Sequence, residues 1–536
     1  MRDILAEIVE RRKNDLARAG YSFGFAIPAD RTRAVHPFLP QKGVILEVKR
    51  ASPSKGDIAP ALDAAETARS YAESGAAAIS CLTESNFFKG TLDDLQQVCR
   101  AVDAYEAETG KRGPAVLRKD FLLAPEEVEI AWRAGADAVL LIARILERDT
   151  MLAMAQAAAA HGMSCLIEVR LPEDLAKLSY VAAAVDTGKL VCGVNSRDLA
   201  TFRIDLLAPC MLLPAIRAIL GADARVVFES GVRTPEAAGV TGAFGFSGLL
   251  LGEAAAKNPS LRAQFVEQFT HAQETAHARF WLDYARSLAE SSMKPAVATA
   301  TVSTATANGC TAQAVSTAQP SALSGTAPAD SSTAHCPTAA HTPKSRVKIC
   351  GLTKSEDVLL ADSLDAAFVG FIFAAGFPRS VAFDGRFESI QPALQHVRAK
   401  KIAVITDAHS AEAEKACALV QSGVLDCLQL HGIRYEDVPP RMLELPHYFA
   451  VIGQDALKKA EALFEKGEVR VLIDTKQHDE AQLAAQAHLW LAGGITPESL
   501  PLITQTLAPE LIDISSGVEG ATVGEKDAAK MKAVLL

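Results

Sequence analysis

The sequence predicts an α/β protein of two (β/α)8 TIM barrels joined by a long low-complexity linker. At 536 residues the chain exceeds the size at which a single core stops growing. Short apolar runs alternate with Ala-rich amphipathic segments on both sides of one stretch of biased composition. Strands that alternate with helices indicate βαβ units and a parallel sheet. A doubly wound open sheet remains the alternative, because periodicity does not show whether a sheet closes.

Eight apolar runs on each side of that stretch predict strands, which is the number a closed barrel of this kind needs. The predicted strands of the N-terminal half are Val44–Lys49, Ala77–Glu84, Ala115–Asp120, Ala138–Arg144, Ser164–Arg170, Val191–Asp198, Arg225–Val232 and Gly248–Ala254. Those of the C-terminal half are Arg346–Thr353, Phe368–Ala374, Lys401–Asp407, Cys427–Gly432, Tyr448–Gly453, Val469–Thr475, Leu489–Ile495 and Leu511–Glu519.

Composition indicates the domain boundaries. Residues 291–343 are rich in Ala, Thr and Ser, and Lys294 and Asp330 are the only charged residues among them. This segment has no apolar periodicity, which is typical of a disordered tether. We therefore expect one barrel in residues 1–290 and another in residues 344–536. A mucin-like stalk is the alternative, which the lack of a signal-peptide pattern disfavours.

Bulk composition narrows the class of protein. A net charge of −10 argues against a nucleic-acid partner. The sequence has no run of 18 uncharged apolar residues that would predict a membrane span. The ten cysteines include no Cys-x-x-Cys pair, which is typical of reduced thiols. We expect a soluble, cytoplasmic monomer that acts on small molecules and has no membrane partner.

Charged residues lie inside the predicted strands of the N-terminal half. Side chains alternate between the two faces of a strand, so Glu47 and Lys49 of "ILEVK" face the barrel axis. The same alternation turns four further residues inward near the ends of their strands: Lys119, Glu168, Asn195 and Arg197. A structural ion pair explains any one of them alone. Six such residues from four strands predict a shared catalytic site, because these barrels carry their active sites at this end.

Burial of these charges close together is expected to change their pKa values. A low-dielectric surrounding disfavours the charged form, so we expect raised carboxylate pKa values and lowered lysine pKa values. Groups shifted in this way are suited to proton transfer near neutral pH.

Glycines and serines at the last two strands of each half predict phosphate sites. Backbone N–H groups at such loops bind anions, and glycine permits a close approach. The candidates in the N-terminal half are Ser230, Gly231, Gly252 and Glu253. Those in the C-terminal half are Gly493, Gly494, Ser515, Ser516 and Gly517. Glycines that serve only tight turns are the alternative for either set, and the repetition of the pattern favours phosphate.

The C-terminal half predicts a second and different site. Lys348 and Cys350 share a face of the first strand, and Asp474 ends the sixth strand facing inward. A thiolate and a carboxylic acid across one mouth are suited to base and acid catalysis on a sugar phosphate. A buried, inert thiol is the alternative for a lone cysteine. Further candidates for substrate binding are Arg379, Gln429 and His431.

No cofactor or metal is expected. The glycines of residues 239–248 do not form a dinucleotide fingerprint, and the histidines lack the spacing typical of metal ligands.

The motifs of both halves resemble known enzyme families. Residues 1 to about 260 are similar to indole-3-glycerol-phosphate synthase through "ILEVKRASPSKG", "CLTE", "VLRKDF", "LIEV", "GVNSRDL", "ESGV" and "LLLGEA". Residues 346–536 are similar to phosphoribosylanthranilate isomerase through "VKICGLT", "GFIF", "LQLHG", "IDT", "LAGGIT" and "DISSGVE". The chain therefore resembles the bifunctional synthase–isomerase enzymes of tryptophan biosynthesis, which are both lyases and isomerases.

The resemblance implies roles for the residues. In the isomerase reaction, an Amadori rearrangement of phosphoribosylanthranilate, Cys350 removes the C2′ proton and Asp474 protonates the ring oxygen. The product, carboxyphenylamino-deoxyribulose phosphate, is the substrate of the synthase, which closes the indole ring with loss of carbon dioxide and water. There Lys119 is the general acid on the carbonyl and Lys49 contacts the substrate carboxylate.

Further synthase roles follow from the same resemblance. Glu47 and Glu168 handle protons, and Asn195 positions the hydroxyl or the anilino group. Ser52, Arg197, Ser230, Gly231 and Gly252 complete the synthase site. In the isomerase, Arg379 neutralises a substrate carboxylate. Neither reaction of these families needs a metal or a cofactor.

Two alternatives remain. The chain departs from the isomerase pattern after Asp474, where it has no glycine before Gly493. An active synthase with a catalytically weak or scaffolding C-terminal barrel is therefore the first alternative. A Schiff-base aldolase that uses Lys119 is the second, because such enzymes share the fold and the phosphate site. The synthase motif is also altered mildly, with Ser196 where a second Asn is usual.

Overall fold

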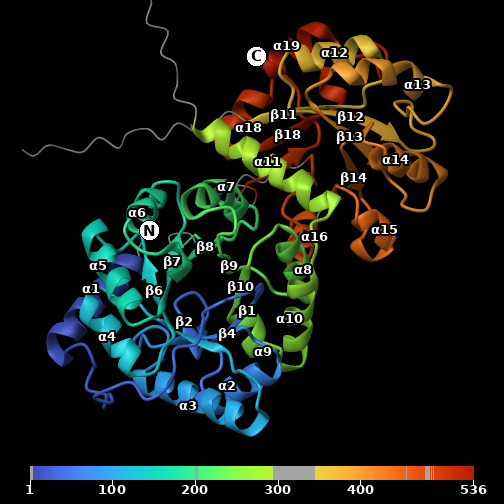
Figure 1. The fold of residues 1–536 in the computed structure, drawn as a ribbon. Helices are drawn as coiled ribbons and strands as arrows, with labels where there is room; N and C mark the ends of the chain where they lie inside the picture. Colours follow the sequence, from blue (N-terminus) through green and yellow to red (C-terminus); the bar gives the residue numbers. More distant parts are fainter. Residues whose placement is uncertain are drawn as a thin grey trace, which may run out of the picture.

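The computed structural model describes residues 4–198, 203–293, 345–453, 455–476, 483, 486 and 488–536. It contains two closed barrels, each of eight parallel strands (Figure 1). The predicted pair of barrels is confirmed, and the open-sheet alternative is wrong. The predicted linker lies outside the described residues, apart from its first three, which end the helix of residues 276–293. The boundaries at residues 290 and 344 stay predictions.

The N-terminal barrel closes in the order β1-β10-β9-β8-β7-β6-β5-β4, and β2 pairs with β3 in the loop after β1. Its strands are β1 (Gly43–Val48), β2 (Ala51–Ser52), β3 (Gly56–Asp57), β4 (Ala78–Leu82), β5 (Ala115–Lys119), β6 (Ala138–Ile142), β7 (Ser164–Val169), β8 (Leu190–Asn195), β9 (Val226–Glu229) and β10 (Gly248–Leu251). Its helices are α1 (Ile4–Ala19), α2 (Ala64–Glu73), α3 (Leu92–Thr109), α4 (Pro125–Arg133), α5 (Arg148–Ala160), α6 (Asp174–Ala182), α7 (Ala208–Leu220), α8 (Pro235–Ala243), α9 (Glu253–Lys257), α10 (Arg262–His271) and α11 (Ala276–Met293).

The C-terminal barrel closes in simple sequence order. Its strands are β11 (Arg346–Cys350), β12 (Phe368–Phe373), β13 (Lys400–Ile405), β14 (Cys427–His431), β15 (His447–Ile452), β16 (Val471–Asp474), β17 (Trp490–Ala492) and β18 (Leu511–Ile514). Its helices are α12 (Ser355–Ser363), α13 (Arg386–Ile390), α14 (Ala411–Gln421), α15 (Pro440–Leu443), α16 (Ala456–Glu465), α18 (Leu500–Leu507) and α19 (Ala528–Leu535). None of the described helices in either barrel is both long and apolar enough to span a membrane.

Local sequence explains where the elements begin and end. Thr234 caps α8 by accepting a hydrogen bond from the backbone N–H of Ala237, and Pro235 occupies the first turn, where its missing N–H costs nothing. Gly110 ends α3 in the left-handed conformation with a φ of 67°. The strands end earlier than the apolar runs predict, because the last residues of each run belong to the loops at the mouth.

The alternation predicted for β1 is confirmed. Leu46 and Val48 pack in the layer between sheet and helices, whereas Ile45 packs in the separate cluster inside the barrel. Glu47 lies on the same side of the strand as Ile45. Apolar side chains fill the barrel interior, and charged side chains lie at the strand ends. Glu47 and the other inward-facing charged residues therefore lie at one mouth.

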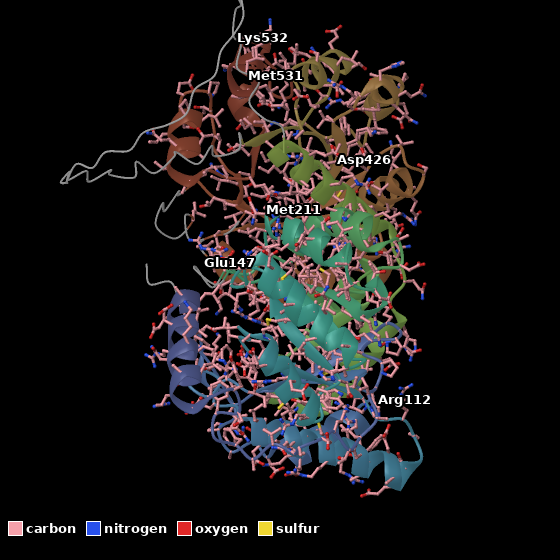
Figure 2. All side chains as sticks on the ribbon, turned by 60° about the vertical axis from the view of Figure 1, so that its left-hand side comes forward. Arg112, Glu147, Met211, Asp426, Met531 and Lys532 are labelled. Carbon is pink, nitrogen blue, oxygen red and sulfur yellow. The ribbon has the colours of Figure 1, made fainter. Side chains whose placement is uncertain are left out.

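Helix α11 joins the two barrels. It lies between them in Figure 1, and its Trp281 and Tyr284 contact Trp490, with ring centroids 5.7 and 5.5 Å apart. Trp490 and Phe368 are the first residues of their strands, so the strand starts of the C-terminal barrel face α11. In Figure 2, Met211 of α7 lies near this junction. The mouth of the C-terminal barrel, at the opposite strand ends, therefore points away from the first barrel.

The junction leads to a prediction about stability. Trp281 is fully buried, and its indole N–H has no hydrogen-bond partner in the described part of the chain. Trp281→Ala should lower the free energy of unfolding by about 3–5 kcal/mol, because it leaves a cavity. Trp281→Phe should cost clearly less, since it keeps a ring and loses no hydrogen bond. Urea unfolding followed by circular dichroism measures both, and equal losses would contradict this account of the junction.

Candidate active sites

Glu47 lies at the centre of the N-terminal mouth between two lysines. Its Oε1 is 3.2 Å from Lys49 Nζ and its Oε2 is 3.7 Å from Lys119 Nζ. The Ser80 hydroxyl lies 3.5 Å from the same Oε2. Only 2% of Glu47 is exposed, so this buried carboxylate depends on the two ammonium groups for its charge.

A second polar group faces Glu47 across the mouth. The side-chain amide of Asn195 donates to Glu168 Oε1 at 3.2 Å. Glu229, at the end of β9, is buried beside them, and its Oε1 has no hydrogen-bond partner among the described residues. Glu229 is missing from the predicted site. The alternation used for the other strands places it inward, because Val227, two residues earlier, packs inside the barrel.

The pKa values of this mouth differ from the expected pattern. Burial alone would raise the pKa of Glu47, but Lys49 and Lys119 lower it below its usual value. Burial alone would lower the pKa of Lys119, but the carboxylates of Glu47, Glu229 and Glu168 raise it. The expectation of a raised carboxylate and a lowered lysine is therefore wrong for this pair. Burial does raise the pKa of Glu229, and the neighbouring Glu168 adds to this effect.

A cavity of about 260 Å³ connects these groups. All the residues predicted for this site line it: Glu47, Lys49, Ser52, Lys119, Glu168, Asn195, Arg197, Ser230, Gly231, Gly252 and Glu253. Its apolar wall includes Phe88 and Phe121, whose ring centroids are 6.0 Å apart, and Ile8 of α1. The cavity therefore offers an apolar wall, a charged floor and a glycine-rich rim, which suits an anionic aromatic substrate.

The backbone at the rim of the cavity restricts which residues fit there. A Cβ at Gly252 would lie 2.6 Å from Glu47 Oε1, so no larger residue fits without moving that carboxylate. Ser230 has a φ of +72°, which is uncommon for a residue other than glycine, and Gly231 follows with a φ of +87°. Glu253 faces the cavity but also forms an ion pair with Lys257 at 2.7 Å.

The C-terminal mouth contains a chain of polar contacts along the strand ends. Lys348 Nζ is 2.7 Å from Asp513 Oδ2 and also donates to Gln429 Oε1. Gln429 Nε2 lies 3.1 Å from His431 Nδ1, and His431 Nε2 lies 3.7 Å from Asp474 Oδ2. The chain therefore joins four of the eight strands, β11, β14, β16 and β18.

The two predicted catalytic groups of this mouth both have raised pKa values. Burial raises the pKa of Cys350, although Lys348 opposes it. Burial also raises the pKa of Asp474, although His431 opposes it. The raised value suits Asp474 as a carboxylic acid. Cys350 is held as a thiol rather than the expected thiolate, so its deprotonation needs a substrate or a neighbouring base.

Arg379 has a partner within the protein. Its Nε and Nη2 donate to the two carboxylate oxygens of Glu519 at 2.6 and 2.8 Å. Neither Glu519 nor Asp513 is among the predicted site residues. The alternation along β18 places Asp513 inward, and this signal was available in the sequence. Glu519 lies beyond the strand, where no periodicity applies.

The loops after β17 and β18 contact each other and the site. A Cβ at Gly517 would lie 1.9 Å from the carbonyl oxygen of Ile495, and one at Gly493 would lie 2.9 Å from Asp474 Oδ1. The Ser515 hydroxyl donates to the carbonyl of Cys350 at 3.2 Å. Gly494 follows β17, and Ser516 begins a short 3-10 turn after β18. Most of the segment after Asp474 on which the alternative of a weak isomerase depends lies outside the described residues.

One group with ligand-like spacing lies at the junction rather than in a mouth. It consists of His277, His447 and Glu468, all buried. His447 is within hydrogen-bond distance of the Leu445 carbonyl through Nδ1 (2.8 Å) and of Glu468 through Nε2 (3.1 Å). Glu468 raises the pKa of His447 against the effect of burial. His447 Nδ1 also lies 3.0 Å from His277 Nδ1, so each member of the group has a hydrogen-bond partner within it.

Comparison with known proteins identifies the chain. The family model of indole-3-glycerol phosphate synthase matches residues 23–269. A synthase of Rhodopirellula baltica is 40% identical over 221 residues, which cover 41% of this chain and 78% of that protein. The chain belongs to the indole-3-glycerol phosphate synthase family. A synthase of Exiguobacterium sibiricum is 34% identical over 271 residues, covering 49% of this chain and 96% of that protein.

The C-terminal barrel matches a second family. The model of N-(5'-phosphoribosyl)anthranilate (PRA) isomerase matches residues 347–535. The solved phosphoribosyl anthranilate isomerase of Thermotoga maritima is 26% identical to this barrel, with a TM-score of 0.31. The match covers 36% of this chain and 97% of that isomerase chain. With both domains, the chain is a bifunctional synthase–isomerase of tryptophan biosynthesis, a carboxy-lyase and an isomerase in one polypeptide. We call its two halves the synthase barrel and the isomerase barrel.

The contact between Gly252 and Glu47 leads to a prediction. Gly252→Ala should lower synthase kcat/KM by roughly 10- to 100-fold, because a small displacement of a reacting group has an effect of that size. Gly239→Ala is the matched control in the same barrel, since its Cβ would meet Gln268 Oε1 at an ordinary 3.5 Å. Synthase and isomerase assays on both variants measure the effect. Unchanged synthase kinetics in Gly252→Ala would contradict the assigned contact.

The raised pKa of Glu229 predicts a pH-dependent change in stability. A carboxyl group whose pKa is higher in the folded state than in the unfolded state destabilises the fold increasingly as pH rises above the unfolded value. Glu229→Gln should therefore raise the thermal unfolding midpoint more at pH 8 than at pH 5.5. Glu253→Gln, at a more exposed carboxylate of the same cavity, should not show this trend. The difference in midpoint between each variant and the parent at the two pH values is the measurement.

Proposed function

We propose that the residues lining the synthase cavity divide the steps of ring closure among them. The observation that supports this most strongly is their convergence: Glu47, Lys49, Lys119, Glu168 and Asn195 meet in one cavity from four strands. Lys119, whose pKa is raised by its carboxylate neighbours, stays charged and is suited to donate a proton to the substrate carbonyl. Lys49 lies beside Glu47, and we assign to it the contact with the substrate carboxylate.

Glu47 and Glu168 then transfer the protons of closure and dehydration. The two carboxylates have different surroundings, because Glu47 is held by two lysines and Glu168 by the amide of Asn195. Unequal environments allow one carboxyl group to act as an acid and another as a base. Glu229, whose pKa is raised, is an additional proton donor beside Glu168. Ser52, Arg197, Ser230, Gly231 and Gly252 complete the site, with the rim glycines facing the substrate phosphate.

In the isomerase barrel, Cys350 acts as the base and Asp474 as the acid. After the substrate or a neighbouring base has taken the proton of the Cys350 thiol, the thiolate takes the C2′ proton. Asp474 gives a proton to the ring oxygen, so the ribose opens and the substrate's proton count is unchanged. The raised pKa of Asp474 supports its role as the donor. Gly493, Gly494, Ser515, Ser516 and Gly517 form the phosphate side of this mouth. Arg379, which Glu519 holds in place, offers its guanidinium to the substrate carboxylate.

The aldolase alternative lacks support from the geometry. A Schiff-base lysine must lose its proton to attack a carbonyl. The carboxylates around Lys119 raise its pKa and keep it protonated instead. We also propose that the enzyme is a monomer in the cytoplasm, which sedimentation and cell fractionation would test.

Single substitutions separate the two activities. Lys119→Met should lower synthase turnover by about 10²–10⁴-fold, the usual contribution of a general acid, and leave isomerase turnover intact. Cys350→Ala should do the reverse. Turnover of each substrate is measured separately, with circular dichroism to confirm folding. If either variant lost both activities while folded, the assignment of two independent sites would be wrong.

A further inference from the structure

The turn between α16 and β16 of the isomerase barrel contacts the rim of the synthase cavity. Figure 1 shows α16 next to α8, and a Cβ at Gly467 would lie 2.9 Å from the Cα of Ala237. Gly467 has a φ of +102°, so both its conformation and this close approach require glycine. The two barrels are therefore packed backbone to backbone at this point.

Arg470, at the end of this turn, forms a buried ion pair with the synthase barrel. Its Nη1 donates to Asp205 Oδ1 at 2.8 Å, and its Nε donates to Glu510 Oε1 at 2.9 Å. His488 closes a ring of four, with Nε2 2.9 Å from Asp205 Oδ2 and Nδ1 2.9 Å from Glu510 Oε2. Asp205 is the one member of this ring from the synthase barrel. Arg470 and Asp205 are only 3% and 7% exposed.

All four groups are charged at neutral pH. Burial would raise the pKa of Asp205, but Arg470 and His488 lower it far more. Burial and Arg470 lower the pKa of His488, but Asp205 and Glu510 outweigh them and raise it to about 9. A buried carboxylate with such partners is costly to leave unpaired.

Asp205 connects this ring to the synthase cavity. Its backbone N–H donates to the carbonyl of Ser196 at 3.0 Å, and the Ser196 hydroxyl donates to the carbonyl of Ser230 at 2.9 Å. The N–H of Arg197 donates to Asn195 Oδ1 at 3.0 Å. Only one residue, Ser196, therefore separates the anchored Asp205 from Asn195 and Arg197, both of which line the cavity.

The last residue of α16, Glu465, contacts the neighbouring rim loop of the synthase. Arg233 Nη1 lies 2.8 Å from Glu465 Oε1, and the Thr234 hydroxyl donates to the carbonyl of Glu465 at 2.9 Å. Arg233 lines the synthase cavity, and Thr234 caps α8. Both synthase loops that follow β8 and β9 thus contact the isomerase barrel.

We propose that Arg470, a residue of the isomerase barrel, is a positioning residue for the synthase reaction: it holds Asp205 and thereby sets the places of Asn195 and Arg197. This inference rests on the proposed roles of those two residues. It differs from a purely adhesive role for the junction, in which the ion pair would affect stability without affecting synthase kinetics.

A double-mutant cycle tests the inference in the full chain. Arg470→Met and Asp205→Asn should each lower synthase kcat/KM by roughly 10- to 100-fold with a raised KM, as expected for misplaced substrate contacts. The double variant should lose no more than the larger single loss, because both changes break the same contact. Isomerase kinetics of Asp205→Asn should be unchanged. Asp205→Asn keeps the shape of the side chain, so it is informative even if Arg470→Met fails to fold.

Stability measured on the same variants separates positioning from adhesion. Arg470→Met leaves the Asp205 carboxylate without its main cation and should lower the thermal midpoint. The double variant removes that unpaired charge and should recover much of the midpoint while its synthase kcat/KM stays low. If the double variant recovered both the thermal midpoint and the synthase kcat/KM, the inference would be wrong. It would also be wrong if the losses in kcat/KM of the two single variants multiplied in the double variant.

Arg346→Met provides the matched control. Arg346 also joins the barrels, donating to the Ser287 hydroxyl at 2.9 Å and lying over the ring of Tyr284. Among the described residues, its side chain has no hydrogen bond to a synthase loop at the mouth. Its removal should leave the synthase KM and kcat at the parent values. An equal loss in Arg346→Met would assign the effect to the junction as a whole and overturn the role of Arg470. Absence of synthase turnover in the parent protein would instead refute the proposed function.

Discussion

Closure of the strands into rings is the constraint on which both sites depend. In a closed parallel barrel every second side chain of each strand faces one interior, and the last such residue of each strand faces one mouth. Residues as distant in sequence as Glu47 and Glu229 thereby become neighbours. Closure also excludes water from the floor of the mouth, so the charges placed there act on one another in a low dielectric.

The charge balance of the synthase mouth follows from this closeness. Among the described residues, Lys49 and Lys119 both form ion pairs with Glu47. Glu168 is held by the amide of Asn195 instead, and no ion pair of Glu229 is found among the described residues. Burial raises the pKa of Glu229, whose Oε1 has no hydrogen-bond partner in the described structure. The raised pKa of Glu229 therefore favours its protonated form beside Glu168.

Much of this arrangement could be predicted from the sequence, because alternation along a strand is a local rule. That rule placed Glu47, Lys119 and Glu168 in one mouth, and the same rule applied to "VVFESG" would have added Glu229. The direction of the pKa shifts could not be predicted in this way. It depends on distances such as the 3.2 Å between Lys49 and Glu47, which are set only when the ring closes.

The contacts at the junction could not be predicted from the sequence, for a different reason. Arg470 and Asp205 lie 265 positions apart, and alternation within the predicted strand Val469–Thr475 does not relate Arg470 to a residue of the other barrel. The pattern of "EKGEVR" is that of an ordinary turn, and Gly467 gains its significance only from Ala237 of the other barrel. Docking between barrels depends on surface complementarity, which local sequence rules do not describe.

The orientation of the barrels also determines what lies on the axis between them. The isomerase mouth opens at the strand ends of Cys350 and Asp474, whereas the strand starts face the synthase barrel. The axis between them is closed by a cluster of aromatic rings, in which Trp490 contacts Tyr448 at 5.1 Å and Trp281 at 5.7 Å between centroids. A phosphorylated intermediate with an aromatic ring does not fit through such packing. The route along the axis of the isomerase barrel is therefore closed, and the contacts at the junction support the synthase loops.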